Sequence, residues 1–118
     1  MPMMEPSEFS GAVPVDGYGP GFFRVAGTVH EGPVIVTQSG ARPWGGTEDM
    51  AALLALAGSV DVLFLGLGAE LVIPPRALVA ALEDAGIMVE PMNTPSAARS
   101  YNVTLSEGRR VACALIPL

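Results

Sequence analysis

The chain has 118 residues, half of them hydrophobic, with a formal net charge of −6 and a single cysteine. This length is typical of one domain with its own core, and one cysteine excludes both an internal disulfide and a cysteine-rich metal cluster. Because binding to nucleic acid or to an anionic membrane depends mainly on clustered lysine and arginine, the acidic balance opposes both.

The amino terminus predicts a tail and no targeting signal. Residues 1–12 are expected to be a flexible tail before a single α/β domain over residues 13–118. The tail has no basic region followed by an apolar one, so it predicts neither a secretory signal nor a mitochondrial transit peptide, and cytoplasmic localisation is the default. Residues 50–73 are apolar, but Asp61 and Glu70 interrupt them, so no direct membrane insertion is expected.

The first third of the chain is rich in glycine and proline, which predicts strands and turns. Residues 21–30 and 34–37 are strand-like, and His30–Pro33 between them predicts a hairpin. Residues 40–46 are expected to form a loop that carries Trp44. This tryptophan is either a cap on the core or a contact residue, because tryptophan is frequent at interface hot spots.

The middle of the chain predicts a parallel strand–helix–strand unit with a right-handed crossover. Thr47 is expected to cap a first helix that Gly58 ends. The unit itself follows as a strand over residues 60–67, a helix over 75–86 and a strand over 87–90. Parallel strands end at one sheet edge, so the Gly66–Ala69 loop should face Met92–Pro95, at the edge where open α/β sheets bind ligands.

The segment after Met92 predicts a short helix. Thr94 precedes Pro95 and is therefore biased toward the extended conformation of an N-cap, and proline fits the first helical position. Asn102 tolerates the left-handed conformation that ends helices, so the helix is expected over residues 95–101. A turn and a fully buried strand over residues 111–116 should follow.

Several residues near this edge are candidates for a binding site. Gly66 and Gly68 either let a ligand approach the backbone or form a strand exit with an unusual φ. Thr94 begins a helix whose free N–H groups could hold an anion, although capping alone explains it. Arg99 and Tyr101 either direct a guanidinium and a phenol into one cleft, or cover apolar surface and fill the core.

Catalytic and metal-binding patterns are missing from the sequence. His30 lies in the expected turn without a second histidine, and Cys113 lies in the buried run, where a thiol is inert. Arg109 is either a contact residue or the partner of a nearby glutamate, and Asn102 is read first as a helix terminator. We therefore expect no catalytic residues, no metal and no cofactor.

One group of residues resembles a known family. Within the last segment its members are Met92, Thr94, Ala97, Ala98, Arg99, Tyr101, Asn102, Glu107, Gly108 and Arg109. Together with Trp44, Gly66 and Gly68, they resemble a family of small domains of unknown biochemical function that includes a mitochondrial assembly factor for respiratory complex I. The resemblance covers about Val15–Leu115, with Asn93 where an aspartate is usual and Leu67 where threonine is frequent.

The resemblance implies a fold and a class of function. The fold is a three-layer α/β domain with a mixed central sheet of about five strands, flanking helices and a β-hairpin layer. The function is a non-enzymatic interaction domain of assembly-factor type, with a subunit of a respiratory or membrane complex as partner and Trp44 and the Arg99/Tyr101 face as contacts. The alternative is a small-molecule or anion pocket, or an unrecognised enzyme, at the Gly66/Thr94 sheet edge beside Met92. The sequence leaves a homo-oligomer open.

Overall fold

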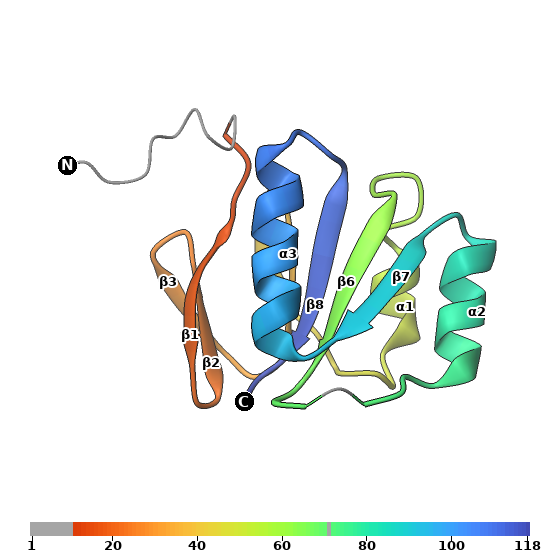
Figure 1. Cartoon of the computed structure of the whole chain (residues 1–118), viewed down its shortest axis with the longest axis horizontal. Coiled ribbons are helices and arrows are strands. Elements are labelled where there is room, and N and C mark those ends of the chain that lie inside the picture. The colour runs from red at the N-terminus through yellow and green to blue at the C-terminus, as the bar shows by residue number, and fades with distance from the viewer. Residues whose placement is uncertain (1–10, 71) are drawn as a thin grey trace.

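The computed structural model describes residues 11–70 and 72–118 and contains two sheets and three helices in that part of the chain (Figure 1). The expected tail over residues 1–12 lies outside the described residues except for Gly11 and Ala12. The elements are β1 Val15–Gly19, β2 Phe22–Val25, β3 Thr28–Glu31, β4 Val34–Thr37, β5 Gly40–Pro43, α1 Met50–Leu54, β6 Val62–Leu67, α2 Arg76–Asp84, β7 Met88–Met92, α3 Thr94–Ser106 and β8 Val111–Ile116.

The central sheet is mixed, as expected. Its five strands have the order β5-β4-β8-β6-β7, in which β6 is parallel to β7 and β8, while β4 is antiparallel to β5 and β8. α3 packs on one face together with the separate antiparallel sheet β1-β2-β3, and α1 and α2 pack on the other (Figure 1). Two hydrophobic clusters fill the spaces on the two sides of the sheet. The three-layer α/β architecture is confirmed.

The hairpin expected at His30–Pro33 is wrong. The actual hairpin joins β2 to β3 through Ala26 and Gly27, both of which have positive φ, at 52° and 78°. His30 pairs with Phe23 inside this hairpin, and β3 and β4 belong to different sheets. Paired positive φ values twist a two-residue turn to match its strands. Ala26 stands where asparagine, aspartate or glycine is usual, so the common sequence signal for this turn is missing.

The loop expected over residues 40–46 is partly a strand. β5 pairs with β4 along its whole length and lies at the edge of the sheet. Pro43 is compatible with this position because an edge strand has N–H groups that need no partner in the sheet. β4 and β5 therefore form a hairpin with its turn at Gln38 and Ser39.

The helices differ from expectation mainly at their ends. Asp49, rather than Thr47, caps α1 by accepting a hydrogen bond from the Ala52 N–H at 3.3 Å, and the helix ends after Leu54, before Gly58. α2 buries Leu78 and Leu82, as its spacing predicts. In residues 11–70 and 72–118, no helix has both the length and the apolar character needed to cross a membrane.

α3 is longer than the expected helix over residues 95–101. Its cap is Asn93, whose side-chain oxygen accepts from the Ser96 N–H at 2.9 Å, so Thr94 is already helical. Asparagine thus makes the bond that an aspartate would make at this position. Asn102 does not end the helix, because its amide is engaged by β1, and this long-range bonding offsets its low helix propensity.

Candidate functional site

The carboxyl ends of the parallel strands meet the start of α3, as expected. The Thr94 hydroxyl accepts a hydrogen bond from the Gly68 N–H at 2.8 Å and donates one to the Ile116 carbonyl at 2.6 Å. The Thr94 N–H also donates to the Gly68 carbonyl at 2.8 Å. Thr94 is completely buried. Its polar groups therefore join β6, β8 and α3 and are not presented to a ligand.

Gly66 serves close packing between α3 and the sheet. A Cβ atom added there would lie 2.9 Å from Thr94 Cα and 2.9 Å from Leu115 Cδ2. Gly68 has a φ of +102°, the left-handed region that glycine tolerates at a strand exit. Packed atoms occupy the space beside Gly66 and Thr94, so this geometry does not favour a small-molecule pocket at that sheet edge.

Tyr101 and Asn102 attach the amino-terminal strand to α3. The Tyr101 hydroxyl donates to the Val13 carbonyl at 2.7 Å, and burial raises the pKa of this phenol well above its usual value. The Asn102 side chain accepts from the Val15 N–H at 2.9 Å and donates to the Val15 carbonyl at 2.8 Å. These two candidates therefore stabilise the fold through their polar atoms.

Trp44 also lies inside the molecule. It is 4% exposed, and its indole N–H donates to the Asp49 carbonyl at 3.1 Å. Its ring belongs to the hydrophobic cluster that α1 and α2 cover. Of the two alternatives left open by the sequence, the structure places Trp44 as a cap on the core.

Arg99 and Arg109 remain exposed and border one cavity of about 350 Å³. We call this cavity the α3/β7 groove, because it lies on the sheet beside α3, over β6 and β7. It is lined by Val62, Phe64, Met88, Glu90, Arg99, Ser100, Val103, Thr104 and Arg109. Two candidates that are ten positions apart in sequence thus meet at one surface. Arg99 also borders a smaller cavity, of about 210 Å³, next to β1.

The groove combines exposed apolar side chains with positive charge. Met88 is 56% exposed and Val103 is 51% exposed, both in contact with the groove. In residues 11–70 and 72–118 the ion pair is Arg110 with Asp61, and neither Arg99 nor Arg109 has an acidic partner there. The apolar side chains between these two guanidinium groups can hold an apolar group flanked by carboxylates.

Sequence reasoning missed Met88 and Val103. A signal existed in α3, because Val103 occupies its solvent-facing side, where Arg99 and Ser106 are also exposed. Met92, which the sequence did name, is half-buried at the edge of the core and accepts a hydrogen bond from the Ser100 hydroxyl at 3.6 Å. It lies beside the groove and does not line it in the described structure.

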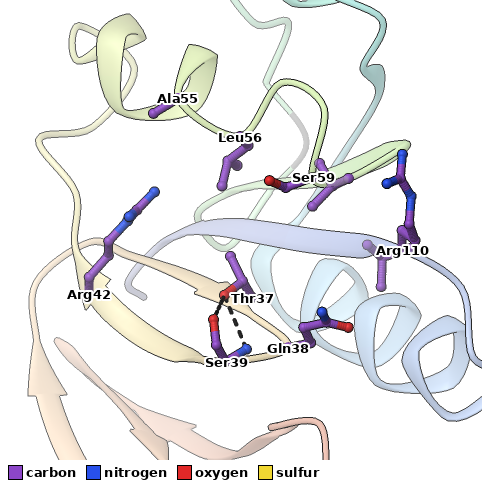
Figure 2. A pocket seen from close by; sticks show the side chains of 10 residues that line it. Thr37, Gln38, Ser39, Arg42, Ala55, Leu56, Ser59 and Arg110 are labelled. Carbon is purple, nitrogen blue, oxygen red and sulfur yellow. Dashed lines mark hydrogen bonds between the residues drawn. The ribbon is translucent and has the colours of Figure 1, made fainter.

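A second, more polar cavity of about 260 Å³ lies at the amino ends of β6 and β8, next to the residues that follow α1 (Figure 2). Arg42 from β5 and Arg110 from the start of β8 stand on opposite sides of it. Arg110 donates to Asp61 at 2.8 Å and to the Gly58 carbonyl at 3.1 Å, and this bonding lowers the pKa of the Asp61 carboxyl. Asp61 already pairs with Arg110, so Arg42 is the basic side chain of this cavity that has no ion pair within residues 11–70 and 72–118.

Cys113 is expected to be chemically inert in the native protein. It is fully buried in β8, and burial raises the pKa of its thiol well above the usual value. Only the thiolate attacks disulfide reagents, so we expect no measurable reaction with DTNB at pH 8 until denaturant is added. Following absorbance with and without urea tests this, and rapid labelling of the folded protein would contradict the burial of Cys113.

The similarity of this chain to known proteins covers all the elements that form the groove. A family described as "Protein of unknown function (DUF498/DUF598)" matches residues 15–116. An uncharacterized protein of Rhodobacter capsulatus is 56% identical over 117 residues, covering 98% of this chain and 94% of that protein. NADH dehydrogenase (ubiquinone) 1 alpha subcomplex assembly factor 3 of Danio rerio is 30% identical, covering 93% and 67%. The crystal structure of an outer membrane protein from Bartonella henselae has a TM-score of 0.81 at 35% identity, covering 91% and 96%.

Proposed function

The chain belongs to the DUF498/DUF598 family of proteins of unknown function, and from that premise we propose that it is a protein-binding domain of assembly-factor type. The partner is a subunit of a respiratory or membrane complex, by analogy with the Danio rerio relative that is named as an assembly factor. The docking surface is the α3/β7 groove. The domain works in the cytoplasm, in keeping with its single, reduced cysteine.

One observation carries this proposal: the groove brings together two exposed apolar side chains and two arginines that have no ion pair within the described part of the chain. Met88 and Val103 are each more than half exposed. Large apolar side chains that gather on a surface usually mark an interaction site. Arginine is enriched at protein interfaces, where its guanidinium pairs with carboxylates. The polar groups of Thr94, Tyr101 and Asn102 form hydrogen bonds within the protein. We therefore assign Arg99 and Arg109 to partner contact.

Replacing Val103 by glutamate is expected to reduce partner recovery strongly. The substitution replaces the apolar contact by a charge one helical turn from Arg99, so the new carboxylate removes that contact and competes with the partner for the arginine. The measurement is affinity purification of the tagged protein from detergent-solubilised cells of its source organism, with quantitative mass spectrometry of respiratory-complex subunits. We expect at least about a tenfold loss of these subunits, equivalent to about 1.4 kcal/mol of binding free energy.

Val29→Glu is the matched control. Val29 is 48% exposed on β3, close to the exposure of Val103, but lies outside the groove. Both variants should retain the native circular dichroism spectrum. Equal recovery of respiratory subunits with both variants would contradict docking in the groove, and recovery of no respiratory subunit by the unmodified protein would contradict the proposed role.

A further inference from the structure

The two faces of the central sheet are covered unequally. α1 and α2 lie on one face, whereas α3 and the β1-β2-β3 sheet cover the other and leave β7 open beside α3 (Figure 1). Val89 of β7 is buried on the face that α1 and α2 cover, while Met88 and Glu90 line the α3/β7 groove on the opposite face. Because strands are about 4.8 Å apart and packed helices about 8–10 Å apart, β7 lies where a helix next to α3 would rest.

The wall of the groove has the form of a helix-packing surface. It consists of Arg99, Ser100, Val103 and Thr104, which are spaced so that they form one stripe along α3. Ser100 and Thr104 are short and hydrogen-bonded within the molecule, through Met92 and the Ser100 carbonyl respectively. Short side chains on a wall let a second helix approach closely, and Val103 provides an apolar contact between them.

The groove favours a helix over an added strand. β7 is an edge strand, so a peptide strand could in principle pair with it. Pro91 in β7 has no N–H group to donate to such a strand. A strand at this edge would also lie beside β7, away from the floor formed by Val62 and Phe64 of β6.

The charges define the occupant further. Arg99 lies in the first half of α3 and Arg109 lies beyond its end, so along the axis they are about 10–15 Å apart at a rise of 1.5 Å per residue. Glu90 lies on the floor and disfavours a carboxylate there. Building on the proposed function, we infer that the groove binds an amphipathic helix of a partner protein with two acidic residues about 7–10 positions apart beside its apolar stripe.

A charge exchange with synthetic peptides tests this inference. The probes are two 15-residue, end-capped peptides with an identical leucine stripe and two glutamates or two lysines eight positions apart. We titrate them into ¹⁵N-labelled protein and into its Arg99→Glu/Arg109→Glu variant. The unmodified protein should bind the glutamate peptide about tenfold more tightly than the lysine peptide, and the variant should show the reverse preference. Shifts should concentrate on residues 62–64, 88–90 and 99–104.

Each outcome decides the inference. A proline in the middle of the glutamate peptide should remove binding, because it breaks the helix but keeps the composition. Equal affinity for both charges, no reversal in the variant, unchanged binding of the proline peptide, or shifts outside the groove would overturn the inference. If no peptide binds while recovery of respiratory subunits still depends on Val103, the helical occupant is wrong and the proposed function stands. If the peptides bind but no respiratory subunit is recovered, only the proposed function fails.

Discussion

Gly66→Ala is expected to lower the free energy of unfolding by about 1–3 kcal/mol, the range found for overpacked cores. The added methyl would lie 2.9 Å from Thr94 Cα, a backbone atom, and 3.1 Å from Ala97 Cβ, so α3 itself must move away from β6. Gly66 does not have a positive φ, so alanine can adopt its backbone conformation, and the loss of stability comes from the steric clash. Urea denaturation followed by far-ultraviolet circular dichroism measures the change.

Gly17→Ala provides the control for this prediction. Gly17 lies in β1, has no positive φ, and an added Cβ would meet no atom within 4 Å. Its replacement should change stability by less than about 1 kcal/mol and in the favourable direction, because alanine restricts the unfolded chain. If Gly66→Ala proved as stable as Gly17→Ala, α3 could not be packed on β6 as closely as the structure places it.

The sequence predicted the central elements because their burial is periodic or continuous. The run Val111–Ile116 is apolar at every position, and β8 lies in the middle of the sheet with side chains in both cores. The helix with Leu78 and Leu82 was predicted from its one apolar face. In the amino-terminal third the pattern was weaker, since β2 buries only Phe23 and Val25, and its turn uses Ala26 in a conformation that alanine rarely adopts.

The candidate site was harder to predict because the roles of its residues depend on distant contacts. Tyr101 and Asn102 bond to Val13 and Val15, which are 87–88 positions away in the chain. No local pattern distinguishes such a tyrosine from one that faces a ligand. Arg99 and Arg109 were both candidates, and both are exposed, but their meeting at one groove depends on how α3 lies beside β7, which spacing alone does not specify.

Thr94→Val should be the second strongly destabilising change, at about 2–4 kcal/mol. Valine has almost the same shape as threonine, so packing is preserved while the Gly68 N–H and the Ile116 carbonyl both lose their hydrogen-bond partner. Each buried group left without a partner costs about 1–3 kcal/mol. Chemical denaturation measures the loss, and hydrogen exchange should show faster opening at the amide of Gly68.

Thr94→Ser separates the hydroxyl from the methyl group. Serine keeps both hydrogen bonds and removes one methyl, so the expected cost is only about 1 kcal/mol. If valine and serine were equally costly, packing rather than hydrogen bonding would hold this edge. If valine destabilises the protein clearly more than serine does, the two hydrogen bonds of the Thr94 hydroxyl hold the ends of β6 and β8 against α3. The position of α3, and with it the wall that carries Arg99 and Val103, then depends on one buried side chain at the amino end of α3, whereas Arg109 lies beyond its carboxyl end.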